Sequence, residues 1–146
     1  MSKVSVLDAS AVLAYLQEEE GQDIVEAALD EGPCWMTTVN TCEVLSKLCE
    51  KGMPLAEAQA ALDDLGLVVK DFDADLAGLA ASLRARTKPI GASLADRACL
   101  ALAHQAAKTQ LTPVVYTAEQ SWPKLKCPFH VVLIRKPTPH RQDVQG

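Results

Sequence analysis

Four carboxylates lie where an α/β protein can bring distant side chains together. Asp8 ends the apolar run 4–7, Glu119 follows the apolar run 113–116, and Glu43 and Asp96 lie near the starts of two helical stretches. Like charges about 4 Å apart repel by roughly 4 kcal/mol at an effective dielectric constant near 20. Converging carboxylates therefore titrate anomalously or bind divalent cations, and all-oxygen ligands favour Mg²⁺ or Mn²⁺ over zinc. Such ions can hold a phosphodiester and activate water for its hydrolysis.

The elements that would position these acids alternate between strand and helix. Apolar runs predict five strands, at residues 4–8, 34–37, 67–69, 113–116 and 130–134. Periodicity and capping residues predict helices at 11–16, 22–30, 38–51, 54–64, 74–86 and 94–107. This alternation predicts an α/β fold, a three-layer α/β/α sandwich around a central, mainly parallel five-stranded sheet with right-handed crossovers.

In an open parallel sheet, ligands bind at the carboxyl ends of the strands, where the strand order reverses. The run 4–8 is apolar enough to be buried on both faces, so we expect it at the centre of the sheet. Asp8 and Glu119 then end strands that can be neighbours at the reversal, and the helix that carries Asp96 enters the same edge. The order of elements therefore predicts a shared pocket.

Each acid also has a purely structural interpretation. Asp96 lies where the helix dipole favours negative charge, so it could simply cap its helix. Glu43 has Lys47 four residues later, in the order that favours an exposed ion pair, and periodicity alone favours that surface pair. Glu119, taken by itself, is an ordinary loop acid.

Composition narrows the class of protein. The 146 residues suit one globular domain, residues 1–136, with a polar, proline-containing tail at 137–146 that we expect to be flexible. Without a membrane-length apolar run or a signal peptide, we expect a cytoplasmic protein with no membrane partner. Five cysteines without CxxC spacing are expected to be small buried thiols. The net charge of −5 argues against broad electrostatic coating of nucleic acid but permits a small site where metal ions carry the positive charge.

Four segments carry a family resemblance: DASA at 8–11, VNTCEVLSKL at 39–48, SLADRACLALA at 93–103 and YTAEQSW at 116–122. In order and spacing they resemble the blocks of PIN-domain proteins, above all the VapC-type toxins of bacterial type II toxin–antitoxin pairs. The resemblance covers residues 4–135. It implies a metal-dependent endoribonuclease that hydrolyses RNA phosphodiesters with metal-activated water, forms a homodimer and is blocked by a cognate antitoxin protein.

The resemblance also implies roles for individual residues. Three acids match the family's catalytic acids and would be the ligands of Mg²⁺ or Mn²⁺: Asp8, Glu43 and Asp96. Glu119 fills a fourth acidic position that is usually Asp, and it would act in catalysis through water or a second ion. Three polar residues match positions that orient the acids: Ser10, Asn40 and Thr117.

Two basic groups could hold RNA phosphates beside the acids or could form an ordinary solvated surface. The first precedes the helix of Asp96 and comprises Arg84, Arg86 and Lys88; the second comprises Lys124 and Lys126. Trp122 and Trp35 could stack on bases, although tryptophans more often lie in a core or an interface.

Other chemistries fit the sequence less well. A phosphatase of the haloacid dehalogenase type needs Asp-x-Asp after the first strand, and a dinucleotide site needs a Gly-rich first turn; both are absent. The histidines His104, His130 and His140 lack zinc-ligand spacing, and no base is evident for Ser or Cys catalysis. The main alternative is a non-catalytic PIN-like RNA- or protein-binding module whose acid cluster serves docking.

Overall fold

Strand β1 (Ser2–Leu7) lies at the centre of a five-stranded sheet in which every strand is parallel to its neighbours. The computed structural model describes residues 2–136. The other strands are β2 (Cys34–Thr37), β3 (Val68–Lys70), β4 (Leu111–Thr117) and β5 (His130–Leu133), and the sheet order is β3-β2-β1-β4-β5. The predicted sheet is confirmed. Its strand order reverses between β1 and β4, which are the strands that precede Asp8 and Glu119.

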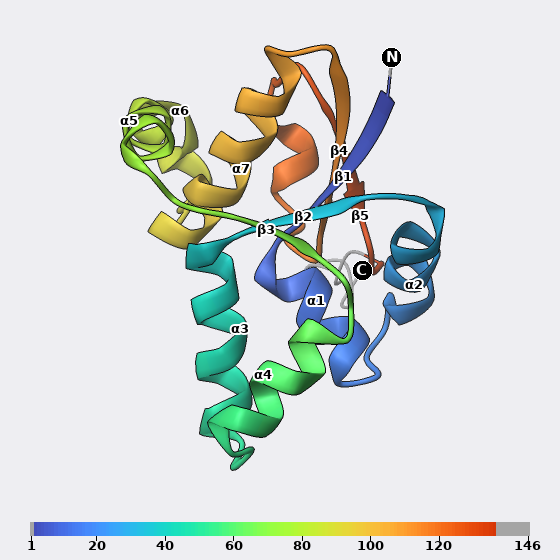
Figure 1. The fold of residues 1–146 in the computed structure, drawn as a ribbon. Coiled ribbons are helices and arrows are strands. Elements are labelled where there is room, and N and C mark those ends of the chain that lie inside the picture. Colours follow the sequence, from blue (N-terminus) through green and yellow to red (C-terminus); the bar gives the residue numbers. More distant parts are fainter. Residues whose placement is uncertain (1, 137–146) are drawn as a thin grey trace, which may run out of the picture.

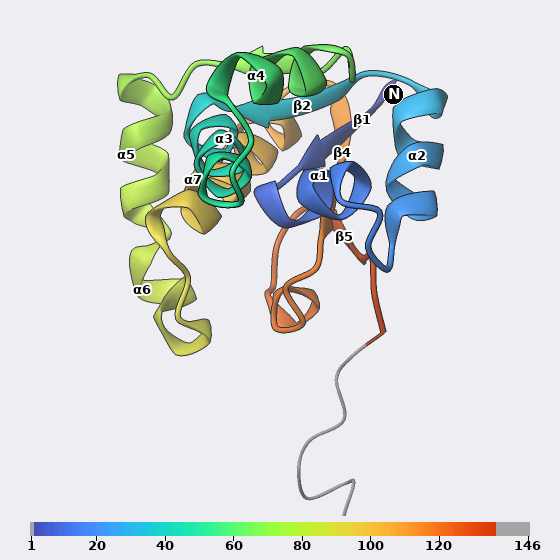
Figure 2. The same cartoon turned by 90° about the horizontal axis from the view of Figure 1, so that it is seen from below.

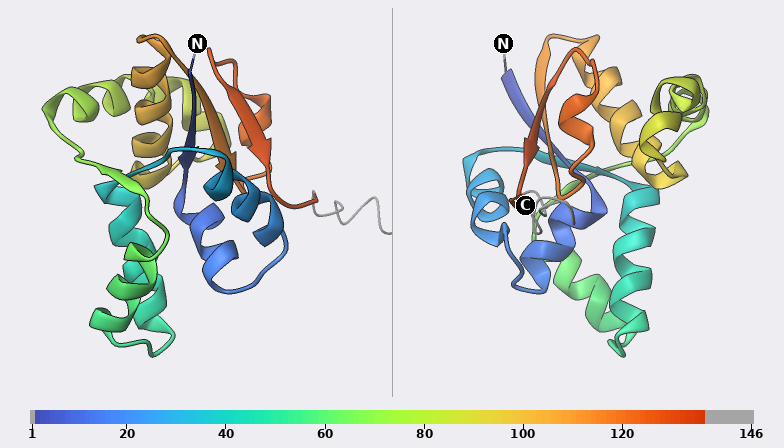
Figure 3. Two further views of the ribbon diagram at one scale, coloured as in Figure 1. Left: turned by 45° about the vertical axis from the view of Figure 1, so that its right-hand side comes forward. Right: turned by 180° about the vertical axis from the view of Figure 1, so that it is seen from behind.

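The helices form a layer on each side of this sheet (Figures 1 and 2). They are α1 (Ala9–Leu16), α2 (Gln22–Glu31), α3 (Thr38–Glu50), α4 (Leu55–Asp63), α5 (Ala74–Ser82), α6 (Arg84–Thr87) and α7 (Leu94–Ala107), with short 3₁₀ helices η1 (Lys88–Ile90) and η2 (Trp122–Lys124). Helices α1 and α2 pack on one face, and α5 and α7 on the other. Helices α3 and α4 form a hairpin that extends past the carboxyl edge of the sheet (Figure 3).

Successive strand residues supply the two halves of the core, because neighbouring side chains on a strand point to opposite faces. Leu7 packs in the cluster under α1 and α2, whereas Val6 packs in the cluster under α5 and α7. Both side chains are fully buried. The same alternation on β4 places Val114 in the first cluster and Val115 in the second. A strand buried on both faces is therefore nearly all apolar, which is why Asp8 stands out at its end.

The predicted helices were wrong in two places. Helix α1 begins at Ala9 rather than residue 11, because the Asp8 side chain caps it. The helix predicted over 74–86 is broken: the Leu83 amide donates to the Ala80 carbonyl three residues back, and α6 starts anew at Arg84. Leu83 is buried in the core, so the tighter turn there is tied to tertiary packing.

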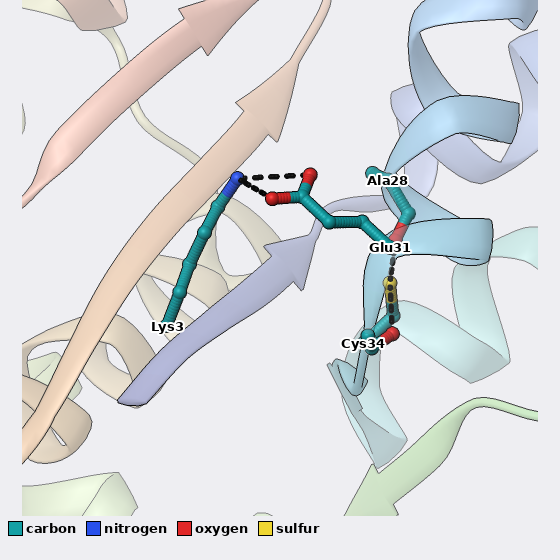
Figure 4. Close-up of polar contacts among 5 residues, drawn as sticks. Lys3, Ala28, Glu31 and Cys34 are labelled. Atoms are coloured by element: carbon teal, nitrogen blue, oxygen red, sulfur yellow. Dashed lines mark hydrogen bonds and ion pairs between the residues drawn. The ribbon is translucent and has the colours of Figure 1, made fainter. Parts of the chain in front are cut away.

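At the amino edge of the sheet, β1 is tied to the end of α2 (Figure 4). Lys3 Nζ donates to both carboxylate oxygens of Glu31 at 3.0 and 3.1 Å, and Cys34 Sγ donates to the Ala28 carbonyl oxygen at 3.3 Å. All five cysteines are free thiols. The expectation that they are buried holds for Cys34 and Cys99 but is wrong for Cys42, which is exposed.

In the part of the chain that the structure describes, no helix has the length and apolar character needed to cross a membrane. The predicted tail at 137–146 lies outside the described residues, so its flexibility and the domain boundary at 136 stay predictions.

Candidate active site

Asp8 is the best-defined residue of the carboxyl edge, where β1 ends and α1 begins (Figure 1). Its side chain is only 3% exposed. Carboxylate oxygen Oδ1 accepts hydrogen bonds from Ser10 Oγ at 2.7 Å and from the Ala11 amide at 2.8 Å, and the second of these caps α1. Oxygen Oδ2 accepts a hydrogen bond from Thr117 Oγ1 at 2.6 Å. The acid is thus fixed by its own helix and by the end of the neighbouring strand.

The two hydroxyls that hold Asp8 also hold the segment after β4. Ser10 Oγ accepts a hydrogen bond from the Ala118 amide at 2.9 Å, and Thr117 Oγ1 accepts one from the Glu119 amide at 2.9 Å. Each hydroxyl donates to Asp8 and accepts from the chain that leads to Glu119. The sequence predicted that Ser10 and Thr117 orient the acids, and both contact Asp8 directly.

The hydrogen bonds within residues 2–136 leave one acceptor position on Asp8. A carboxylate offers about four lone-pair positions, two on each oxygen. Oδ1 uses both and Oδ2 uses one, so the remaining lone pair belongs to Oδ2. Burial raises the pKa of Asp8 to about 6 despite the hydrogen bonds that favour its charged form, and the charge of Asp96 adds to the rise.

Asp96 lies in the first turn of α7 and forms a capping box with Ser93. The Asp96 amide donates to Ser93 Oγ at 3.1 Å, and the Ser93 amide donates to Asp96 Oδ2 at 2.9 Å. The structural interpretation of this acid is therefore correct. Within residues 2–136 no hydrogen bond engages its other oxygen, Oδ1. Capping with one oxygen is compatible with ligand binding by the other.

Asn40 connects α3 to the turn that carries Asp96. Its side chain is 1% exposed. Nδ2 donates to the Ala95 carbonyl oxygen at 3.0 Å, and Oδ1 accepts from Thr37 Oγ1 at 2.6 Å. Asn40 was predicted to orient the acids. Among residues 2–136 its hydrogen bonds go to Thr37 and Ala95 and not to the acids, so it acts on Asp96 through the backbone of the preceding residue.

Glu43 and Glu119 complete the acidic edge. Glu43 is half-buried on α3, and Glu119 is exposed just after β4. Partial burial raises the pKa of Glu119, and the charges of Asp96 and Glu43 raise it further, whereas Lys47 lowers it. The alternative interpretation of Glu43, a surface ion pair with Lys47, is wrong: in residues 2–136 the ion pairs are Lys3–Glu31 and Arg135–Glu19. The positive charge of Lys47 instead lowers the pKa of Glu119.

Cys99 lies beneath the acids and was missed as part of the site. Burial raises its pKa well above the usual value, and the charges of Asp8, Asp96 and Glu43 all raise it further. The charges of three acids from three different elements therefore all influence the buried Cys99 thiol. The spacing of Cys99, three residues after Asp96 on the same helical face, was the available signal.

The acids are gathered at one edge but do not form a closed metal cage. Among residues 2–136, no group of three His, Cys, Asp or Glu side chains is close enough to hold a metal ion. The donor chemistry nevertheless fits Mg²⁺ or Mn²⁺, because the candidate ligands are carboxylates, and the hydrogen bonds of residues 2–136 leave one lone pair free on Asp8 and one oxygen unengaged on Asp96. Repulsion keeps uncompensated carboxylates apart, and a cation removes that repulsion.

The two predicted basic groups are only partly brought together. Arg86 lines a cavity with Lys124 and Lys126, whereas Arg84 and Lys88 are exposed and do not line it. Trp122 is 1% exposed and belongs to the core, so it cannot stack on a base. Trp35 is half-buried under Lys70, whose Nζ lies 4.1 Å from the ring centroid.

Comparison with known proteins adds a family and a fold. The model of the family described as PIN domain matches residues 5–121. No curated protein matches the chain in sequence.

Three similar solved structures have TM-scores of 0.65, 0.63 and 0.59. They are VapBC2 from Rickettsia felis bound to a promoter DNA fragment, DNA-bound VapBC from Salmonella typhimurium and a toxin–antitoxin complex from Klebsiella pneumoniae. The identities are 14, 16 and 16%. The matches cover 88, 90 and 86% of this chain and 97, 98 and 98% of the matched chains. Similarity at this level concerns the fold.

Proposed function

Because this chain belongs to the PIN domain family, we propose that it is a metal-dependent endoribonuclease and the toxin of a type II toxin–antitoxin pair. One observation carries the proposal: buried Asp8 is held at the β1–β4 reversal by Ser10, Ala11 and Thr117. A carboxylate buried at the ligand-binding edge of a parallel sheet needs a positive partner when it is ionised. A divalent cation would supply it.

The residues that would hold the ion come from three elements. Asp8 would use the free lone pair of Oδ2, Asp96 would use Oδ1, and Glu43 would bind directly or orient the attacking water. The bound ion would supply the charge that stabilises the scissile phosphodiester and lowers the pKa of water. Ser10 and Thr117 would fix the Asp8 rotamer, as hydrogen-bond partners of metal ligands do.

Glu119 and Lys47 would serve the reacting phosphate at the rim. Burial raises the pKa of Glu119 above its ordinary value, and its side chain is exposed, so it can exchange a proton with a water or leaving group at the rim. Lys47 lies close enough to lower that pKa, and its ammonium can contact a phosphate oxygen beside the acids. Hydrolysis by water would leave a 5′-phosphate and a 3′-hydroxyl.

The proposed protein partners are a cognate antitoxin and a second copy of the chain. The similar structures are toxin–antitoxin complexes, which supports the first. The acidic edge also favours an inhibitor that inserts a basic side chain among Asp8, Asp96 and Glu43.

A second candidate function is a non-catalytic binding module. It is favoured by the capping role of Asp96 and by the absence, among residues 2–136, of three side chains gathered closely enough to hold a metal ion. In that function the acids would bind a basic partner without metal.

Cleavage of RNA with Mg²⁺, with Mn²⁺ and with EDTA separates the two functions. We expect cleavage by the wild-type chain with either metal and none with EDTA or in Asp8→Asn. The matched control is Asp30→Asn, which changes an exposed acid on α2 and should cleave normally. Metal-independent cleavage, or full activity in Asp8→Asn, would reject the proposed mechanism. A metal-loaded wild-type chain that binds RNA without cutting it would favour the binding module.

A further inference from the structure

A cavity of about 270 Å³ lies on the α7 side of the sheet, outside the acid cluster. Its walls come from α6, α7 and the connection between β4 and β5. Figure 2 shows α6 and that connection, drawn in orange, extending to the same side of the molecule. The floor is apolar and includes Leu83, Leu100 and Phe129.

The rim of this cavity is cationic. Arg86 comes from α6, and Lys124 and Lys126 come from the β4–β5 connection. All three side chains are exposed, and none of the lining residues in the described range 2–136 is acidic. The whole chain has a net charge of −5, so this positively charged rim is opposite in sign to the protein's overall charge. It favours an anionic ligand.

The floor carries an aromatic pair. The rings of His104 and Phe129 meet edge to face, with centroids 5.0 Å apart. Burial lowers the pKa of His104, and the charges of Arg86 and Lys108 lower it further. A neutral imidazole beside Phe129 can stack on a flat ring and can also exchange a hydrogen bond with its edge.

We propose that this cavity binds one nucleotide of the RNA substrate, with its base on the floor beside Phe129 and its phosphate at Arg86, Lys124 and Lys126. The inference rests on the proposed function, and it adds a base-selecting site to it. A flat apolar ring joined to a phosphate matches an apolar floor under a cationic rim, and base–aromatic stacking contributes to binding of single strands.

The cavity is connected to the acids along the backbone. The Trp122 amide donates to the Glu119 carbonyl, and the Leu125 amide donates to the Trp122 carbonyl. On the other side, the Ala92 amide donates to the Thr87 carbonyl, immediately before Ser93. Both walls of the cavity therefore continue into segments that carry acids of the site. A strand of RNA can lie across the two.

Binding of mononucleotides in EDTA tests the cavity without cleavage. The probes are AMP, GMP, CMP and UMP, with ribose 5-phosphate and adenosine as partial ligands, measured by calorimetric titration of the full chain. We expect at least one nucleotide to bind about tenfold more tightly than ribose 5-phosphate, since the base adds stacking. If ribose 5-phosphate binds as tightly as the nucleotides, the cavity is only an anion site and the proposal is overturned. The absence of any nucleotide binding would overturn it too.

Matched variants locate the binding. Arg86→Ala and Lys124→Ala should each weaken nucleotide binding roughly five- to tenfold, because each removes a charged phosphate contact. Arg84→Ala and Lys88→Ala remove exposed cations from the same segment but not from the rim, and should leave binding unchanged. Phe129→Leu should weaken binding of nucleotides but not of ribose 5-phosphate. Equal losses in the rim variants and their controls would overturn the proposal.

Cleavage separates this inference from the nuclease proposal. If the chain binds nucleotides through the rim but never cuts RNA, the nucleotide-binding cavity stands and the nuclease proposal fails. If it cuts RNA, Phe129→Leu should change the base preference at the cut, whereas Arg86→Ala should slow the cleavage of all sequences alike, because a phosphate contact carries no base information. Cleavage with an unchanged base preference in Phe129→Leu would overturn base selection by this cavity.

Discussion

Thr117 Oγ1 donates a 2.6 Å hydrogen bond to Asp8 Oδ2 and so joins the ends of two adjacent strands whose residues lie 109 positions apart in the chain. The same hydroxyl accepts a hydrogen bond from the Glu119 amide. One buried side chain thereby sets the position of the first acid and of the backbone that carries the last. Its role can be tested with a substitution that keeps its shape.

Thr117→Val keeps the volume of the side chain but removes both hydrogen bonds. Asp8 Oδ2 and the Glu119 amide then lose a partner in a buried place, which costs about 1–3 kcal/mol of unfolding free energy. RNA cleavage should fall sharply, because Asp8 is no longer held. Urea unfolding and cleavage rates measure the two effects. Thr117→Ser retains the hydroxyl and should stay close to wild type in both; a Val variant with normal cleavage would exclude a positioning role.

The raised pKa of Asp8 predicts a pH-dependent stability in the metal-free protein. Its folded pKa is about 6 against an ordinary value of 3.8, so the folded state binds the proton more tightly than the unfolded state. The favourable contribution of Asp8 to the free energy of unfolding is complete below pH 3.8 and is lost as the pH rises through 6. The loss amounts to about 3 kcal/mol, since one pH unit corresponds to 1.36 kcal/mol.

Asp8→Asn isolates this contribution. Asn Oδ1 can still accept from Ser10 and the Ala11 amide, and its amide can donate to Thr117 Oγ1. The variant should match wild type near pH 4 and should be more stable by about 3 kcal/mol at pH 8 in EDTA. Burial lowers the pKa of His104, so this residue makes the folded state more stable as the pH rises. Both proteins contain His104, so its effect cancels in the difference between them. An unfolding difference independent of pH would contradict a raised Asp8 pKa.

Divalent metal should reverse the order of stability of these two proteins. An ion that binds only the folded state stabilises it by about 4.1 kcal/mol at a thousandfold excess over its Kd, which exceeds the advantage of about 3 kcal/mol that Asp8→Asn has in EDTA. We expect Mg²⁺ or Mn²⁺ to raise the Tm of the wild-type chain and to have little effect on Asp8→Asn. Asp30→Asn controls for general screening by the salt. Equal shifts in all three proteins would argue against a metal site at Asp8.

The order of elements was predictable because each strand and helix carries its own local signal. The apolar run before Asp8 indicated a strand buried on both faces, and that strand is central. Asp8 and Glu119 were expected to be neighbours because they follow adjacent parallel strands, whose carboxyl ends lie at the same edge of the sheet. The sequence also carries the signal of the capping box at the start of α7, because Ser93 is followed three residues later by the acid Asp96.

Features that depend on tertiary contacts were not predictable. The break at Leu83 arises where that side chain enters the core, and its sequence is a good helix former. The pairing of Glu43 with Lys47 was favoured by their spacing, but Lys47 acts on Glu119, which is 72 positions further along the chain than Lys47. The meeting of Arg86 with Lys124 required the packing of α6 beside the β4–β5 connection. Local spacing contains no information on such contacts.

Asn40 provides the test of how the acids are held relative to one another. Asn40→Ala removes the bond to the Ala95 carbonyl and the acceptor for Thr37 Oγ1, so we expect a loss of about 1–3 kcal/mol in unfolding free energy. The first turn of α7 would then be free to move, and Asp96 with it. The Mg²⁺ concentration needed for half-maximal cleavage should therefore rise.

Thr41→Val is the matched control for Asn40→Ala, because Thr41 Oγ1 donates to the Thr37 carbonyl oxygen at 3.0 Å on the same helix without reaching α7. It should lower stability slightly and leave the Mg²⁺ requirement unchanged. If both variants shift that requirement equally, Asn40 serves the stability of α3 alone. If only Asn40→Ala shifts it, the link from α3 to α7 is what holds Asp96 where it can bind the ion proposed at Asp8.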